Sequence, residues 1–321
     1  MISLNIILSW HESMLPHWKK KNAENRKNNL KKSFFSAHLV RPSFSPIVCA
    51  FCLLLTVLYA VSIFHPGALS WLRYPKFNFF MFMMIFLISL GVWLYSVVIE
   101  STFEGNHTFM VQKGIRAGFI LFVVSEIMFF FSFFWAFFHS SLAPNVEVGC
   151  VWPPSGVTPI DPFGLPLVNT VILLVSGASL TCSHNFLLGG KFLKLSIRFM
   201  SITILLGILF TFIQIFEYCE TPINISSSSY GSSFFILTGF HGLHVLVGTV
   251  MLTVSLLRLH QFHFSSNHHL GLETAIWYWH FVDVVWLFLY IWVYWWGGNK
   301  WVISESVLSV PKKPKNCLVS F

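Results

Sequence analysis

Two carboxyl groups of this sequence lie in the middle of long apolar stretches. Glu126 is central in GFILFVVSEIMFFFSFFWAFF, and Asp283 is central in AIWYWHFVDVVWLFLYIW. A charged side chain near the centre of a bilayer costs roughly 2.5–3.5 kcal/mol on insertion scales, so each carboxyl needs a compensating partner or a neutral form. Two interpretations stay open for each residue: a carboxyl that exchanges protons or contacts lipid, and a hydrogen-bonded acid that holds two helices together.

Histidines in the same stretches are the candidate partners. His280 precedes Asp283 by three residues and therefore shares its helix face. His241 and His244 have the same spacing within GFHGLH, whose glycines are expected to allow close approach of a neighbouring helix. We predict one intramembrane polar cluster, made of Glu126, His241, His244, His280 and Asp283.

Fourteen histidines and six cysteines raise the question of a metal centre. Haem held between two helices needs histidine pairs repeated at a fixed separation on both, and copper sites draw Cys and His from convergent loops. The sequence has neither pattern. Cys49 and Cys52 have metal-ligand spacing, but they lie in an apolar stretch without a His or carboxylate neighbour, where cysteine acts as a small hydrophobic residue. We therefore expect no metal, no cofactor and no catalytic residue in this chain.

The composition indicates that these groups sit on membrane-spanning helices. Hydrophobic residues make up 55% of the 321 residues and charged residues 10%, which is too few to cover a soluble core. The apolar runs are continuous and do not alternate, which favours helices over a barrel. The fold class we predict is an all-α, polytopic integral membrane protein. Its seven predicted spans are approximately 47–64, 77–99, 114–138, 165–187, 197–216, 233–257 and 274–296.

The basic residues predict the orientation. Fourteen of the twenty Lys and Arg fall on the side that holds the N-terminus, and six fall on the other side. By the positive-inside rule, the N-terminus lies in the cytoplasm or the mitochondrial matrix and the C-terminus lies opposite. Eight of the basic residues precede residue 47, which is typical of a juxtamembrane tail and does not indicate nucleic-acid binding. The tail does not have the composition of an import peptide.

Several strings resemble cytochrome c oxidase subunit III, in that family's order and at its spacing from about residue 38 to 297. They are ESTFEG at 100–105, QKG at 112–114, SE at 125–126, FFWAFFHSSLAP at 133–144, WPP at 152–154, GFHGLH at 239–244 and WYWHFVDVVW at 277–286.

This resemblance implies seven helices in a two-plus-five, V-shaped arrangement whose cleft holds structural phospholipids. The implied parts are a basic N-terminal extension on the matrix side at 1–46, two helices at 47–104, a five-helix bundle at 105–297 and a C-terminal tail at 298–321. It also implies a non-catalytic core subunit of mitochondrial cytochrome c oxidase (complex IV) in the inner mitochondrial membrane. Such a subunit stabilises the catalytic subunit and supports proton uptake, while the haem and copper belong to partner subunits I and II. Accessory subunits are further partners.

The resemblance also assigns individual residues. The family's lipid-binding positions correspond to Trp93, Glu100, Thr102, His107, Arg258, His263 and His268. Arg and His donate to phosphate, and Glu accepts from an ethanolamine head group. Glu126 matches the family's intramembrane carboxyl, which reacts with hydrophobic carbodiimides. Ile99 and Gln261 stand where the family often has Arg and Lys, which removes two phosphate contacts.

Two other functions stay open. A self-standing transporter or channel would use Glu126 and Asp283 as a proton path, although the spans show no inverted repeat. The second alternative is a quinol-oxidase subunit of the same superfamily. A chain that lacked the first two spans would favour this alternative.

Overall fold

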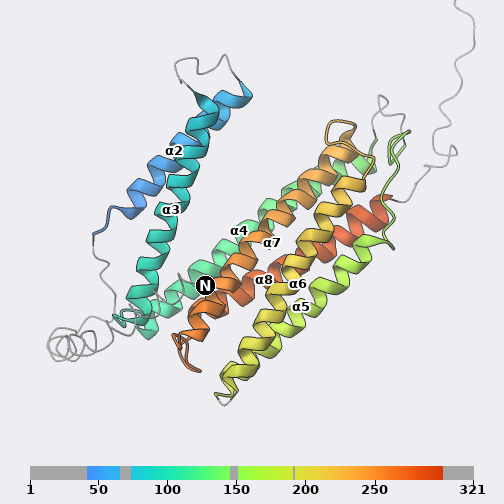
Figure 1. Ribbon diagram of the computed structural model, residues 1–321. Coiled ribbons are helices and arrows are strands. Elements are labelled where there is room, and N and C mark those ends of the chain that lie inside the picture. Colours follow the sequence, from blue (N-terminus) through green and yellow to red (C-terminus); the bar gives the residue numbers. More distant parts are fainter. Residues whose placement is uncertain (1–41, 66–73, 145–150, 191, 299–321) are drawn as a thin grey trace, which may run out of the picture. The chain divides into compact units, whose positions relative to one another are not determined.

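The structure is a computed structural model that describes residues 42–65, 74–144, 151–190 and 192–298. The basic extension and the C-terminal tail therefore fall almost entirely outside the described residues. Within the described ranges the secondary structure is helical and contains no strand. The helices are α2 (Ser45–Phe64), α3 (Pro75–Thr102), α4 (Phe109–Leu142), α5 (Leu165–Leu188), α6 (Leu193–Glu220), α7 (Ser229–His260) and α8 (Leu270–Leu289), which continues as the π-helical segment η2 (Tyr290–Trp296) (Figure 1).

All seven predicted spans are confirmed as helices that are long and apolar enough to cross a membrane. Most run several residues beyond the predicted bounds, because a helix continues into polar sequence where a hydropathy window stops. Proline occupies the first or second position of three of them, at Pro46, Pro75 and Pro166, where a backbone N–H would have no partner within the helix. Ser228 caps α7 by accepting a hydrogen bond from the Gly231 N–H at 3.1 Å.

The chain divides into two compact units, at residues 1–115 and 116–321. In the first unit, α2 and α3 pack side by side (Figure 1). The buried face of α2 is made of small side chains, Cys49, Cys52, Thr56 and Ser62. The Cys49 thiol donates to Ser89 Oγ of α3 at 3.3 Å. Small residues let two backbones approach where lipid supplies no hydrophobic driving force, so these cysteines are packing residues.

In the second unit, hydroxyl side chains join α5 to α6. Ser183 and Ser196 exchange hydrogen bonds, each hydroxyl donating to the other residue's carbonyl at 2.8 Å. Ser179 and Thr203 form a further contact at 2.7 Å, and all four side chains are buried. These short side chains satisfy their own polar groups while keeping the two helices close.

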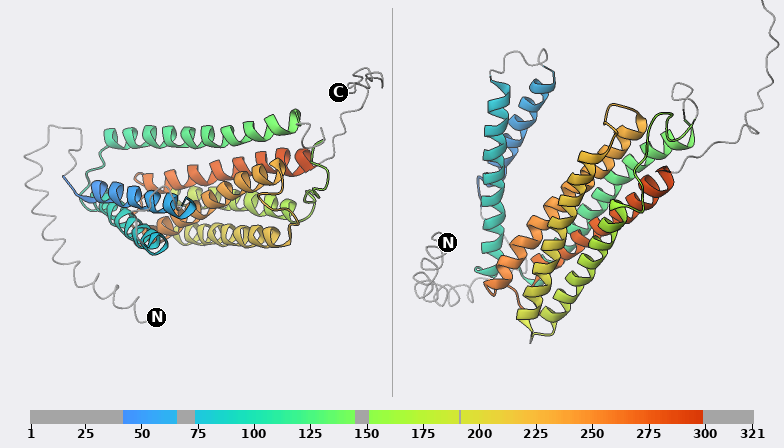
Figure 2. Two further views of the ribbon diagram at one scale, coloured as in Figure 1. Left: turned by 90° about the horizontal axis from the view of Figure 1, so that it is seen from above. Right: turned by 45° about the vertical axis from the view of Figure 1, so that its right-hand side comes forward.

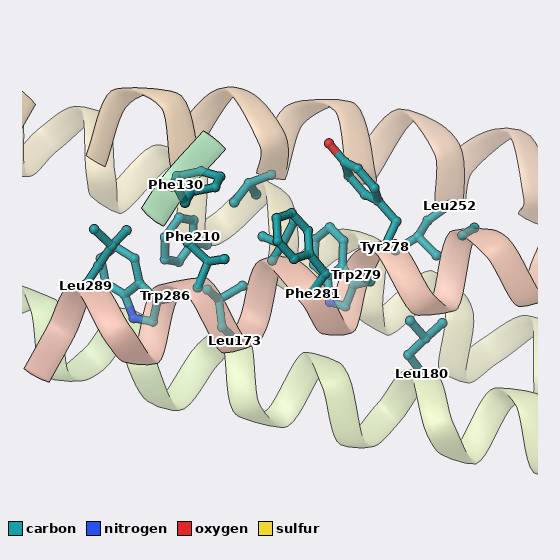
Figure 3. Close-up of a cluster of buried hydrophobic side chains, with 14 of the residues drawn as sticks. Phe130, Leu173, Leu180, Phe210, Leu252, Tyr278, Trp279, Phe281, Trp286 and Leu289 are labelled. Carbon is teal, nitrogen blue, oxygen red and sulfur yellow. The ribbon is translucent and has the colours of Figure 1, made fainter. Parts of the chain in front are cut away.

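The indole of Trp279 on α8 fills the space between three other helices. Its N–H donates to Ser176 Oγ of α5 at 2.9 Å, and its ring lies against Gly207 of α6 and Gly248 of α7. The side chain is fully buried. Trp286, two turns later, repeats the pattern by donating to Thr170 Oγ1 at 2.9 Å. Figure 3 shows both tryptophans within the cluster of buried side chains. Helix α8 therefore contacts α5, α6 and α7 through this one indole.

Helix α4 contacts α7 and α8 through aromatic side chains. Phe129 meets Phe240 with ring centroids 5.0 Å apart, and Phe138 meets Trp292 at 5.3 Å. In Figure 2 this helix lies along one side of the five-helix bundle. Most of its remaining surface is exposed, including Leu121, Phe131 and Trp135. Exposed apolar faces of this kind suit lipid or a neighbouring membrane subunit.

The GFHGLH glycines, which were expected to allow close helix approach, make no close contact with another helix of the described chain. A Cβ atom built on Gly239 or Gly242 meets nothing within 4 Å. Both glycines point away from the packed faces of α7. The close approaches occur at Gly177, Gly207 and Gly248, which the sequence pattern did not single out.

We predict that Gly207→Ala destabilises the second unit. The added methyl would lie 2.6 Å from Trp279 Cη2 and 2.8 Å from Thr249 Cγ2, and the buried indole has no room to move. Overpacking of a filled core costs about 1–3 kcal/mol. Thermal unfolding of the purified protein in detergent, followed by tryptophan fluorescence, measures the loss. Gly239→Ala is the matched control because its methyl enters open space, and equal transition temperatures for the two variants would contradict the packing role of Gly207.

Candidate functional site

Glu126 and His244 form an intramembrane pair between α4 and α7. Glu126 Oε2 lies 2.8 Å from His244 Nε2. The imidazole is mostly buried, whereas the carboxyl is 23% exposed. Phe130 of α4 packs against the same imidazole with ring centroids 5.0 Å apart. The structure thus brings together two of the predicted site residues that are 118 positions apart in the sequence.

The backbone fixes the tautomer of His244. Its Nδ1 lies 2.6 Å from the carbonyl oxygen of Phe240, which only accepts, so Nδ1 carries a proton. Nε2 then faces Glu126 with a single proton for the two groups. That proton sits either on the carboxyl, giving two neutral groups, or on the imidazole, giving an ion pair. Both forms have zero net charge, and the form with two neutral groups also avoids the cost of desolvating two ions.

His280 and Asp283 form a second pair, on the side of α8 that faces α5. His280 Nδ1 lies 3.7 Å from Asp283 Oδ2, and Thr181 Oγ1 lies 3.5 Å from His280 Nε2. A Cβ atom on Gly177 would lie 2.5 Å from Asp283 Oδ2. The glycine therefore makes room for the carboxyl against the backbone of α5.

His241 takes a structural position in the core. Its Nε2–H donates to the carbonyl oxygen of Val282 at 3.2 Å, and its ring packs against Trp286 at 5.1 Å between centroids. The five predicted site residues therefore occupy two pairs and one position bonded to the backbone. The pairs lie on different sides of α8.

A cluster that the sequence analysis missed lies where α8 begins. Glu273 accepts from Arg116 of α4 at 2.9 Å and lies 3.3 Å from His269 Nε2. His269 Nε2 is also 3.2 Å from His184 Nε2 of α5, and its Nδ1 lies 3.0 Å from the Ser265 carbonyl oxygen. The cluster joins α4, α5 and α8 by charge and hydrogen bonds. Its sequence signal is the i, i+4 spacing of His269 and Glu273, which lies just outside the predicted span 274–296.

A second missed group surrounds Glu217 near the end of α6. Tyr294 donates to Glu217 Oε1 at 2.7 Å, and Gln214 Nε2 lies 3.2 Å from the same oxygen. Asn169 of α5 donates to Gln214 Oε1 at 3.4 Å. All four side chains are buried. The signal that could have found it is Gln214 and Glu217 at i, i+3, but the predicted span ended at residue 216.

The predicted lipid-binding residues belong to both units, and each set is described by itself. In the first unit, Trp93, Glu100 and Thr102 lie on the C-terminal half of α3, and His107 follows the helix. The His107 carbonyl accepts from Gln112 Nε2 at 3.0 Å.

In the second unit, Arg258 lies in the last turn of α7. Its guanidinium carbon is 4.4 Å from the centroid of the Phe264 ring, and a Cβ atom on Gly271 would lie 2.5 Å from its Nη1. The loop that follows carries His263, whose N–H donates to the Arg258 carbonyl at 3.0 Å, and His268, whose N–H donates to Ser265 Oγ at 3.1 Å. The three residues therefore gather at one end of the second unit.

Metal-ligating side chains do not converge in the part of the chain that the structure describes, where no group of three or more His, Cys, Asp or Glu residues has the geometry to hold a metal ion. The arrangements found are instead carboxyl groups paired with imidazole, guanidinium, amide or phenol donors. Such pairs bind or share protons and hold helices together.

Comparison with known proteins identifies the family to which the chain belongs. The family model of cytochrome c oxidase subunit III matches residues 35–298. The chain is 49% identical to cytochrome c oxidase subunit 3 of Latimeria chalumnae over 262 residues, 51% identical to that of Osphranter robustus over 265 and 50% identical to that of Sus scrofa over 270. Each match covers 81% of this chain and 97% of the relative. The resemblance first noted in the sequence is confirmed, and the chain belongs to the cytochrome c oxidase subunit III family.

Proposed function

We propose that this chain is a non-catalytic core subunit of the mitochondrial oxidase that binds phospholipid, stabilises the catalytic subunit and supports proton uptake during electron transfer from cytochrome c to oxygen. The family match over residues 35–298 is the observation that carries the proposal. In this proposal the haem and copper reside in subunits I and II, and the chain binds no redox cofactor. It lies in the inner mitochondrial membrane with its N-terminus in the matrix, beside subunits I and II and accessory subunits.

The end of α7 supports phospholipid binding. Arg258 presents a cation at a helix terminus, where its guanidinium lies over the Phe264 ring and the missing side chain of Gly271 leaves room for it. His263 and His268 add imidazole donors on the adjoining loop. A guanidinium with nearby donors suits a phosphate, and helix ends lie at the depth of the lipid head groups. The Glu100, Thr102 and His107 set on the first unit offers both acceptor and donor groups to a zwitterionic head group.

The Glu126–His244 pair supports a role in proton handling. The two groups share one proton at 2.8 Å, and the carboxyl is partly exposed toward the surface of the second unit. Both protonation states are neutral overall, so the proton moves between oxygen and nitrogen without creating a net buried charge. The pair therefore suits a group that holds one proton, which either partner can carry, beside a redox enzyme and does not itself react with oxygen.

The lipid assignment predicts that Arg258→Ala combined with His263→Ala depletes bound phospholipid and shortens the time for which the oxidase sustains turnover. The reason is the loss of the guanidinium and one imidazole donor from the proposed head-group site. Mass spectrometry of lipids in the purified complex, together with activity followed over many turnovers, measures both effects. Arg198→Ala with His260→Ala is the control, because both residues are exposed and lie on the same side of the membrane by the predicted orientation. Unchanged lipid content in the Arg258 variant would refute the assignment.

Glu126→Gln is predicted to leave haem content and the initial rate of electron transfer close to those of the wild type. The amide keeps a hydrogen-bond donor toward His244, and in the proposal the redox centres lie in other subunits. Optical spectra and the initial rate of cytochrome c oxidation test this. Complete loss of electron transfer would show that Glu126 belongs to the reaction itself.

His244→Leu is predicted to increase labelling of Glu126 by a hydrophobic carbodiimide, because the reagent reacts with the neutral acid. Without the imidazole, the shared proton has only the carboxyl to occupy in this apolar setting. Peptide mass spectrometry of labelled membranes measures the change, and Glu126→Gln gives the background. A fall in labelling would mean that His244 keeps Glu126 protonated.

A further inference from the structure

Glu217 is a buried carboxyl whose partners among the described residues are all uncharged. Its side chain is 3% exposed, and those of Asn169, Gln214 and Tyr294 are equally enclosed. Tyr294 Oη donates to Glu217 Oε1 at 2.7 Å. Gln214 Nε2 approaches both Glu217 Oε1 at 3.2 Å and Tyr294 Oη at 3.3 Å. The group joins α5, α6 and η2 within the second unit.

The hydrogen bonds fix the orientation of both amides. Gln214 must point its NH2 group at Glu217, because the carboxylate oxygen accepts. Its Oε1 therefore faces Asn169, which must present its own NH2 group, at 3.4 Å. Two acceptor atoms are left over. Asn169 Oδ1 and Glu217 Oε2 are both buried, and neither receives a hydrogen bond from a described residue.

Among the described residues, no group bonded to Glu217 carries a positive charge. Within the described ranges, no Lys, Arg or His forms an ion pair or hydrogen bond with Glu217. The other titratable groups close enough to interact electrostatically with it are the phenols of Tyr218 on α6, Tyr230 on α7 and Tyr294 on η2. An ionised Glu217 would thus be a buried charge held by two donors on one oxygen only, which is a costly state.

We propose that Glu217 is a proton-binding site, and that the folded protein holds it as the neutral acid with the proton on Oε2. Proton binding converts the carboxylate to a carboxyl and turns one of the two surplus acceptors into a donor. The remaining surplus acceptor, Asn169 Oδ1, belongs to a side chain bonded to the same Gln214 amide. One proton therefore removes the charge and balances the donors against the acceptors.

A metal cation fits the group less well. Hard cations take a full shell of oxygen ligands, about 6–8 for Ca²⁺. The group offers two oxygens that are not already hydrogen-bonded. The inference does not depend on the proposed lipid binding or on the role of Glu126, since it rests on a separate set of contacts at the end of α6.

Infrared spectroscopy of the intact oxidase complex tests the proposal. The spectrum of the wild type minus that of Glu217→Gln is expected to show loss of a protonated-carboxyl C=O band at neutral pH, and this band should shift to lower frequency in D2O. Glu220→Gln, which removes an exposed carboxyl three residues further on, should show no such loss. Asn169→Leu keeps the acid and removes the amide that is bonded to Gln214, so it should shift the frequency of the band without abolishing it.

If the Glu217→Gln difference spectrum shows loss of carboxylate stretching bands and no loss of a C=O band, the proposal is overturned. If those carboxylate bands also depend on Na⁺ or K⁺, a cation occupies the site. Gln presents an N–H donor where the neutral acid presents O–H. Failure of the Glu217→Gln complex to assemble would therefore also count against a neutral Glu217. In that case the Asn169→Leu spectrum still decides whether a protonated-carboxyl band is present.

Discussion

The contact of the Trp279 indole with three other helices is the interaction on which the packing of the second unit depends. The ring needs Gly207 on α6 and Gly248 on α7 to be glycine, and its N–H needs the Ser176 hydroxyl of α5. In lipid the hydrophobic effect does not drive helices together, so close packing and satisfied polar groups must do so. A large flat side chain with one donor meets both needs at once. The hydrogen bonds exchanged by Ser183 and Ser196 serve the same end between α5 and α6.

This packing also determines where the polar pairs lie. Because Trp279 and Trp286 turn one face of α8 toward α5 and α6, Asp283 comes to lie against Gly177. Helix α4 lies on another side of the bundle, where Phe129 and Phe130 pack against His244 and Glu126 is the polar side chain that it meets. The aromatic layer keeps α4 from packing backbone to backbone, and it leaves the carboxyl partly exposed. The location of a protonatable group near the protein surface is thus a consequence of the side chains around it.

The sequence predicts the seven helices because each apolar run is long enough to span a bilayer and the prolines fall near the helix ends. It also predicts the spacing of His280 and Asp283, since i, i+3 neighbours share a helix face. It does not predict that Glu126 meets His244 while Asp283 does not, because that choice depends on how each helix is rotated about its axis. Glu217 and Glu273 are missed for a simpler reason: a hydropathy window ends at the first charged residue, whereas the helix and its buried face continue.

Four carboxyl groups in the second unit illustrate the ways in which an acid is accommodated in a membrane helix. Glu273 has a cation, Arg116, near the end of the bundle where water and head groups lower the cost of charge. Glu126 has an imidazole with which it shares a proton. Asp283 has a more distant imidazole, at 3.7 Å, and a glycine that gives it space. Glu217 has only amide and phenol donors among the described residues. In this order, the partners range from a full positive charge to no charge. The less positive charge the partners supply, the more the carboxyl depends on a bound proton for its neutralisation. The acid with the least basic surroundings is therefore the one whose contacts require a bound proton most strongly.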